Sequence, residues 1–339
     1  MLLLPKVAPI THPSDIENRV VAIACGSGKE GAMLRTISTS LLLAFLLVLG
    51  ATQIRAEPLV VVTTTNVLLS FDSNTPGTIV TSVSVSGLQS GESILGIDRR
   101  PANGQIYGLG STSRLYSINP TTGVATQVGS AGAFTLSGTS FGIDFNSVVD
   151  RLRVVSNTGQ NLRLNPNDGT LTATDTALTF AAGDPNSAAT PRAVGAAYTN
   201  NVAGAVQTTL FVVDSNLDIL TTQGSPNGTP VSPNTGQLFT IGSLGFNTSD
   251  LVGFDISGFT GTAYAALTAP AANSSQLFSV NLSNGAVTAI GTIGGGIPIT
   301  SLAAAVGNPV PEPATILLLS IGVTGLSLRV RNRRRVHTD

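Results

Sequence analysis

Three aspartates at equivalent places of a repeated pattern are the first residues here that could do chemistry. Asp98, Asp144 and Asp255 end the segments ILGID, SFGID and LVGFD, each two residues after a glycine. Carboxylates at equivalent places can converge on one channel, and Ca²⁺ prefers several hard oxygen ligands of this kind. The same aspartates could instead cap their own turns by accepting backbone N–H bonds. We favour capping, which needs no cofactor, because the fourth copy, AVGAA at 193–197, has no carboxylate.

The densest group of charges in the chain is a second candidate site. Asp150, Arg151 and Arg153 are near neighbours in sequence, and Arg163 follows one strand later. Guanidinium groups present planar forks of donors that suit a carboxylate or a sugar, so the group could be a ligand patch. The alternative is a set of salt bridges between structural repeats. The sequence leaves both interpretations open.

The composition of residues 57–306 restricts the enzyme classes that are available. This region contains no His, Cys, Lys, Met or Trp. Ser-His-Asp and Cys-His catalysis and the usual His/Cys zinc sites are therefore excluded there, and carboxylate chemistry remains. Seven arginines against thirteen acidic residues give a net charge of about −6, which argues against nucleic acid as a partner.

Repeats of a strand–turn–strand pattern would position these residues. LYSINPTTGVATQVG at 115–129 combines two alternating strands with an Asn-Pro-x-x-Gly turn, and residues 162–176 and 277–291 are variants of it. Each copy follows a strand that contains a conspicuous glycine. Those glycines are Gly96, Gly142, Gly195 and Gly253. Units of four short strands at a spacing of roughly 45–60 residues are typical of propeller blades.

We therefore predict an all-β fold, a five-bladed β-propeller at residues 57–306. Residues 299–304 resemble a first strand without successors, and residues 60–87 resemble later strands without a first. Together they would form a composite blade that closes the ring and removes its free edges. The remaining blades are expected at 94–130, 140–177, 193–242 and 251–293. A β-solenoid is the main alternative, and in the propeller the glycines would let the inner backbones approach one another.

Both ends of the chain have the patterns of sorting segments. Residues 33–56 have a basic start, an apolar core and a small-residue end, which is the layout of a signal peptide. Residues 1–32 lack this layout, so we expect an over-extended reading frame or an unstructured extension, with either Met1 or Met33 as the start. Residues 307–339 contain an apolar stretch followed by an arginine cluster, which predicts a short transmembrane helix.

Two resemblances to known families follow from these segments. Val310, Pro311, Glu312 and Pro313, then the apolar stretch, then the arginines, resemble the PEP-CTERM sorting signal. This implies transient membrane insertion, processing by an exosortase, and delivery to the surface or matrix of a Gram-negative bacterium. GIDRRPANGQIYGLGSTSRLYSINPTTG at 96–123 and DRLRVVSNTGQNLRLNPNDG at 150–169 resemble the bacterial domain of unknown function 4394 family, which has no assigned chemistry.

The expected function is that of a secreted, non-enzymatic binding or structural module of the envelope or matrix. Its partners would be the exosortase and an extracellular polysaccharide or envelope protein. The alternative is a carboxylate-based glycoside hydrolase or lyase acting on extracellular polysaccharide. Two carboxylates about 5–10 Å apart in an open cleft would favour that enzyme.

Overall fold

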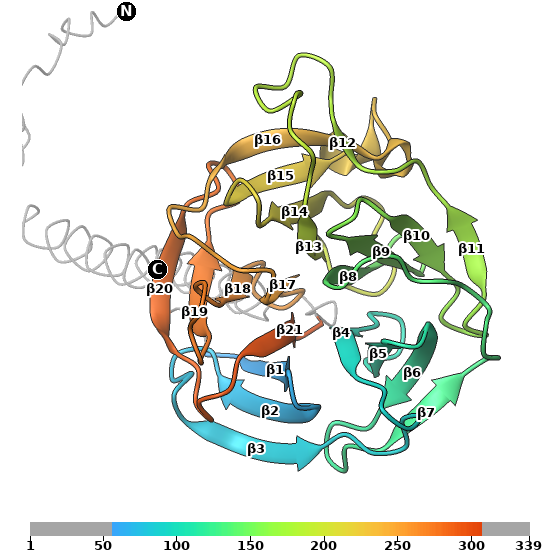
Figure 1. Cartoon of the computed structure of the whole chain (residues 1–339), viewed down its shortest axis with the longest axis vertical. Coiled ribbons are helices and arrows are strands. Elements are labelled where there is room, and N and C mark those ends of the chain that lie inside the picture. The colour runs from blue at the N-terminus through green and yellow to red at the C-terminus, as the bar shows by residue number, and fades with distance from the viewer. Residues whose placement is uncertain (1–55, 307–339) are drawn as a thin grey trace, which may run out of the picture. The chain divides into compact units, whose positions relative to one another are not determined.

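Five β-sheets stand in a ring around one axis in the computed structural model, which describes residues 56–306 (Figure 1). Four sheets have four strands and one has five. This arrangement is a five-bladed β-propeller, so the predicted fold class is confirmed. The predicted signal peptide and transmembrane helix fall outside the described residues. Between residues 56 and 306, no helix has the length and apolar character needed to cross a membrane.

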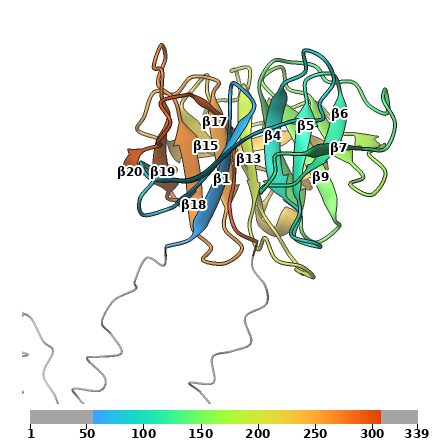
Figure 2. The same cartoon turned by 90° about the horizontal axis from the view of Figure 1, so that it is seen from below.

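One blade combines the two ends of the described chain. Its order from the axis outward is β21 (Ile299–Ala303), β1 (Pro58–Thr63), β2 (Val67–Asp72) and β3 (Ile79–Ser84). β21 and β1 pair antiparallel, with Val60 opposite Ala303. Figure 2 shows that the first and last described residues leave the ring at the same face. The last strand therefore occupies the inner position of the first blade, as the unpaired segment at 299–304 predicted.

The other four blades follow one another, each built from its inner strand outward. Counting the composite blade as the first, the second blade has β4 (Ile94–Arg99), β5 (Ile106–Gly110), β6 (Arg114–Ile118) and β7 (Ala125–Val128); the third has β8 (Phe141–Asn146), β9 (Arg151–Ser156), β10 (Asn161–Leu164) and β11 (Leu171–Thr174); the fourth has β13 (Ala193–Tyr198), β14 (Leu210–Asp214), β15 (Ile219–Gln223) and β16 (Gln237–Ser243); the fifth has β17 (Val252–Ile256), β18 (Ala263–Leu267), β19 (Gln276–Val280) and β20 (Val287–Thr292). The short β12 (Thr179–Phe180) extends the fourth blade beyond β16. The 3₁₀ turns η1 (Pro226–Gly228) and η2 (Pro233–Thr235) lie in the β15–β16 loop.

Burial falls from the axis to the rim of each blade. Every residue of β13, β14, β17 and β18 is buried, whereas β3, β11 and β20 have no fully buried residue. Inner strands are covered on both faces by neighbouring blades, so they are apolar almost throughout instead of alternating. A polar side chain on an inner strand is therefore an exception that needs an explanation.

The inner strands form a closed ring in the order β21, β4, β8, β13, β17. A Cβ atom on Gly142 would lie 2.5 Å from the backbone carbon of Gly195, and one on Gly253 would lie 2.6 Å from the backbone nitrogen of Leu302. Only a residue without a side chain permits these separations. The predicted role of the repeated glycines, close approach of backbones at the axis, is confirmed at these two positions.

Candidate functional site at the axis and the arginine pocket

Three carboxylates meet at the centre of the ring. Asp98 lies on β4, Asp144 on β8 and Asp255 on β17, each two residues after the axial glycine of its strand. Because side chains alternate along a strand, the aspartate and the glycine share the face turned to the next inner strand. Their residues are 0–1% exposed, and one oxygen from each lies within 4.8 Å of the others. The structure therefore brings together all three aspartates that the sequence singled out. We call them the axial triad.

Two members of the axial triad connect neighbouring blades. Asp98 accepts hydrogen bonds from the N–H of the following residue at 2.6 Å and from the N–H of Phe145 on β8 at 2.7 Å. Asp255 repeats this pattern with its following residue at 2.6 Å and with Ala304, just after β21, at 2.6 Å. The turn caps expected from the sequence are not what these aspartates form. Asp98 and Asp255 bond to the next inner strand because they lie within a strand, on the face that packs against that neighbour.

Asp144 differs from the other two members of the triad. In the ionised form neither of its carboxylate oxygens accepts a hydrogen bond from a donor in the described chain, although the residue is fully buried, and the neighbouring carboxyl of Asp255 is close enough to share a proton with it. The equivalent donor would be the N–H of Tyr198 on β13, which is near enough to lower the pKa of Asp144 without forming a hydrogen bond of ordinary geometry. A charged carboxylate buried in this way is strongly unfavourable unless a proton or a cation compensates it.

Burial raises the pKa of every member of the axial triad. For Asp98 the charge of Asp255 adds to the effect of burial, and for Asp144 the charges of both other aspartates do, so both pKa values lie well above the usual range. For Asp255 burial raises the pKa to about 6. Arg99 is a positive neighbour that acts on Asp98 and Asp255. Three like charges this close share protons unless a cation joins them.

The second candidate group separates into two places. Asp150, at the turn before β9, forms a salt bridge with Arg100 of the preceding blade, and Nε of Arg100 donates to it at 2.8 Å. Arg151 donates to the backbone carbonyl of Asp150 at 2.9 Å. For Asp150, the geometry is the salt bridge between repeats that the sequence offered as the alternative to a ligand patch.

Arg153 and Arg163 stay together and share one counterion. Both bind Asp175, which follows β11, at 2.5 Å and 2.8 Å. Arg153 is 1% exposed, and it also donates to Asn161 at 2.7 Å, to Asn234 at 2.6 Å and to the Tyr198 hydroxyl at 3.4 Å. The hydrogen bonds with Arg163 and Arg153 lower the pKa of Asp175, although burial opposes them. Two positive charges against one negative charge leave a net positive charge here.

These two arginines line an open pocket of about 250 Å³, which we call the arginine pocket. The Arg163 side chain is 26% exposed and binds Asp175 through Nε and Nη2; within residues 56–306, its Nη1 has no hydrogen-bond partner. The wall also contains Val148, Val149 and Val206, which are 42%, 52% and 90% exposed. They are three of the seven large apolar side chains that the described part of the chain exposes. Charge and exposed apolar surface therefore coincide here.

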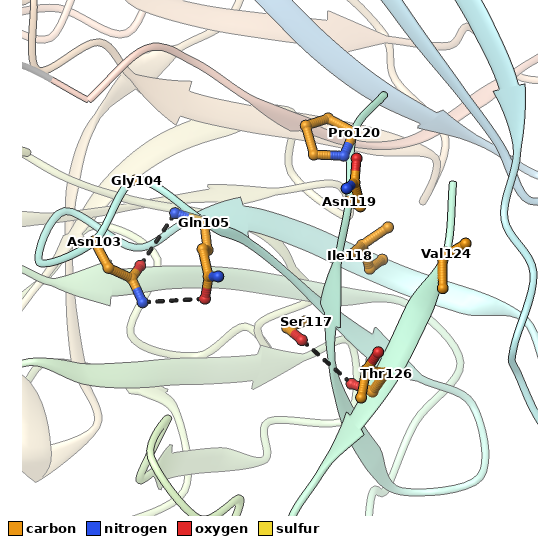
Figure 3. A pocket seen from close by; sticks show the side chains of 9 residues that line it. All are labelled: Asn103, Gly104, Gln105, Ser117, Ile118, Asn119, Pro120, Val124 and Thr126. Carbon is orange, nitrogen blue, oxygen red and sulfur yellow. Dashed lines mark hydrogen bonds between the residues drawn. The ribbon is translucent and has the colours of Figure 1, made fainter. Parts of the chain in front are cut away.

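A larger pocket lies on the blade formed by β4–β7 (Figure 3). Its volume is about 430 Å³, and its lining is neutral: Asn103, Gly104, Gln105, Ser117, Ile118, Asn119, Pro120, Val124 and Thr126. The N–H of Gln105 donates to the Asn103 side chain at 3.1 Å. Sequence reasoning assigned no site here, and it also missed Val206 and Asp175. The Asn119-Pro120 turn is a sequence signal at this place, and by itself it indicates only a turn.

Comparison with known proteins identifies a family but no activity. The model of the family described as domain of unknown function (DUF4394) matches residues 67–303, and the PEP-CTERM protein-sorting motif matches residues 309–334. No curated protein matches the chain significantly.

Similar solved structures are distant. A putative 6-phosphogluconolactonase from Bacteroides uniformis is 14% identical, with 71% of this chain and 84% of that chain covered and a TM-score of 0.38. A protein from Lactobacillus plantarum is also 14% identical, with 71% and 67% covered and a TM-score of 0.37. A chain of a nidogen/laminin complex is 12% identical, with 74% and 98% covered and a TM-score of 0.38. Similarity at this level supports no activity for this chain.

Proposed function

This chain belongs to the DUF4394 family and ends in a PEP-CTERM sorting motif, and we propose that its propeller is a non-enzymatic module that binds acidic polysaccharide in the extracellular matrix of a Gram-negative bacterium. The sorting motif makes it an exosortase-processed protein of the cell surface or extracellular space. The matched segment includes Val310, Pro311, Glu312 and Pro313. Their role as the processing site stays a prediction.

The position of the carboxylates carries the non-enzymatic part of this proposal. Glycoside hydrolases place two carboxylates about 5–10 Å apart on either side of the bound sugar. Here the closest group of carboxylates, the axial triad, is buried away from any substrate. The pockets of about 430, 250 and 190 Å³ in the described region are lined by no Asp or Glu. The alternative, a carboxylate-based hydrolase or lyase, therefore lacks a site in these pockets.

The arginine pocket supports an acidic sugar as the ligand. Nη1 of Arg163 is a free guanidinium donor at an open wall, and a uronate carboxylate is a matching acceptor. The exposed side chains of Val148, Val149 and Val206 offer apolar contacts for the C–H face of a sugar ring. A neutral sugar would use the valines but not the charge. An envelope protein is the alternative partner, and its binding would not require a free guanidinium donor next to exposed valines.

The test measures binding and turnover together. The purified full chain is applied to an array of acidic and neutral bacterial polysaccharides, and the same glycans are analysed for new reducing ends and unsaturated products. We expect binding to acidic glycans, no products, and an affinity at least about tenfold lower for Arg163→Gln. Arg151→Gln is the matched control, because Arg151 carries the same charge on the adjacent strand but donates to backbone carbonyls. Products from the wild type, or full binding by Arg163→Gln, would contradict the proposal.

A further inference from the structure

We propose that the axial triad is a structural Ca²⁺ site, and that the ion locks the ring of inner strands in the calcium-containing extracellular space. The ligands are the carboxylates of Asp98, Asp144 and Asp255. This inference concerns the centre of the ring and is independent of the glycan proposal, which concerns the arginine pocket.

One ion can contact all three carboxylates. Ca²⁺–oxygen distances are about 2.3–2.6 Å, so ligand oxygens on opposite sides of one Ca²⁺ lie at most about 4.6–5.2 Å apart. The triad offers one oxygen per residue within 4.8 Å. Ca²⁺ also tolerates irregular geometry, whereas Mg²⁺ demands a near-ideal octahedron and retains several waters. A closed axial position that is 0–1% exposed therefore suits Ca²⁺ better than Mg²⁺.

The burial and hydrogen bonding of Asp144 point to a bound ligand and not merely to a cluster of polar residues. The residue is fully buried and faces the other two carboxylates, and in its ionised form neither oxygen accepts a hydrogen bond from a donor in the described chain, whereas a protonated carboxyl could bond to Asp255. Buried polar atoms in folded proteins almost always have a partner. Asp98 and Asp255 are held in place by two backbone N–H bonds each, which fix their orientation and leave further lone pairs for an ion.

The local charge also matches a divalent cation. Three ionised carboxylates carry three negative charges, and Arg99 is the positive side chain that acts on the triad. Arg99 donates to the carbonyl of Gly104 at 2.9 Å, so its guanidinium is held beside the triad and not inserted into it. A divalent ion together with Arg99 neutralises the three carboxylates. A shared proton between carboxyl groups is the competing explanation, and the experiment below separates the two.

The ion would act as a cross-link that the chain otherwise lacks. Residues 57–306 contain no cysteine, so no disulfide can join the blades. β4 and β8 are neighbours in the ring, but β13 and β21 separate them from β17. An ion held by one residue from each of these three strands joins blades across the axis. Metal binding of this kind contributes directly to folding free energy.

The test starts from the metal content of the full chain. Because the triad is buried, the protein is unfolded and then refolded in Ca²⁺, in Mg²⁺ or in EDTA, and bound metal is measured by mass spectrometry after desalting. We expect one retained Ca²⁺ per chain. We also expect a melting temperature about 5–10 °C higher than in EDTA when Ca²⁺ exceeds its dissociation constant about 100-fold. Refolded wild type without Ca²⁺, or with a preference for Mg²⁺, would overturn the proposal.

Asp144→Asn is the decisive variant, because it removes one ligand charge at nearly constant volume. It should abolish retention of Ca²⁺ and the calcium-induced rise in melting temperature. Asp214→Asn is the matched control: Asp214 is also fully buried on an inner part of a blade, but it accepts three backbone N–H bonds. This control should change stability equally in Ca²⁺ and EDTA. A calcium response that persists in Asp144→Asn, or is lost in Asp214→Asn, contradicts the assignment, and if Asp144→Asn fails to fold the metal content of the wild type decides.

Discussion

Oδ2 of Asp98 accepts a hydrogen bond from the backbone N–H of Phe145 at 2.7 Å, so a carboxylate on one blade holds the inner strand of the next. Phe145 directly follows Asp144. The bond that orients Asp98 therefore also fixes the part of β8 that carries Asp144. In this way the position of each member of the axial triad depends on a neighbouring blade.

The Asp98–Phe145 bond predicts a loss of stability in Asp98→Ala. The substitution leaves the N–H of Phe145 buried without an acceptor, so the free energy of unfolding should fall by about 2–4 kcal/mol. Urea denaturation in EDTA measures this without any contribution from calcium. Asp168→Ala is the control, because Asp168 is exposed and bonds only within its own turn. Equal stabilities of the two variants would show that the inter-blade bond contributes nothing.

The blades could be predicted from the sequence because each blade repeats a local pattern. The glycine of the inner strand, the alternating hairpin and the Asn-Pro-x-x-Gly turn lie within one unit of chain. The segment at 299–304 had no hairpin after it, which was enough to predict that it completes the first blade. These signals are local, and strand pairing within the four continuous blades is local as well.

Contacts between blades and loops could not be predicted in the same way. Nothing in the ILGID segment indicates that Asp98 bonds to Phe145, because the register between two inner strands follows from packing around the axis. Val206 and Asn234 lie in the β13–β14 and β15–β16 loops, which periodicity does not describe, yet both line the arginine pocket with Arg163. The sequence identified the chemistry-bearing residues but not their partners.

Gly142→Ala should destabilise the ring severely. The added Cβ would lie 2.5 Å from the backbone carbon of Gly195, and backbone on a packed inner strand cannot move away as a side-chain tip can. We expect a loss of about 3 kcal/mol or a failure to fold. Gly77→Ala is the matched control, since its Cβ would meet only the Thr292 carbonyl at 3.6 Å. Thermal unfolding of both variants compares them, and a small effect at Gly142 would contradict the close approach of β8 and β13.

Arg153→Met should be much more damaging than Arg151→Met. Arg153 is buried, and its loss removes one hydrogen bond each to Asp175, Asn161 and Asn234 in one step. Asp175 keeps Arg163 as a counterion, so the cost should be smaller than the roughly 3–5 kcal/mol of a fully unpaired buried charge, and we expect about 2–3 kcal/mol. Chemical denaturation at pH 7 measures the difference. If Arg153→Met kept the stability of the wild type, the buried network around Asp175 would be energetically neutral.

The pH dependence of the metal-free chain should reveal the charge state of the axial triad. The pKa of Asp255 is raised from 3.8 to about 6 by burial, and the pKa values of Asp98 and Asp144 are raised as well. The folded state therefore binds these protons more tightly than the unfolded state. Their contribution to stability is fully present below about pH 4 and is lost as pH rises through about 6, because the unfolded chain then releases the protons more easily.

Other charged groups fix the range over which this is measured. The charge of Arg99 opposes the rise in the pKa of Asp98, and the charge of Glu57 adds to the rise in the pKa of Asp255. Asp175 and Asp250 have lowered pKa values from their arginine partners despite burial, so their contribution is lost at low pH, below the ordinary carboxyl range. Burial also raises the pKa of Asp214, so the difference between the wild type and Asp144→Asn is what isolates the triad. Unfolding midpoints in EDTA between about pH 4.5 and 7.5 should fall with pH in the wild type but less in Asp144→Asn. Midpoints that rise across this range in EDTA would mean that the triad is already ionised in the folded, metal-free protein.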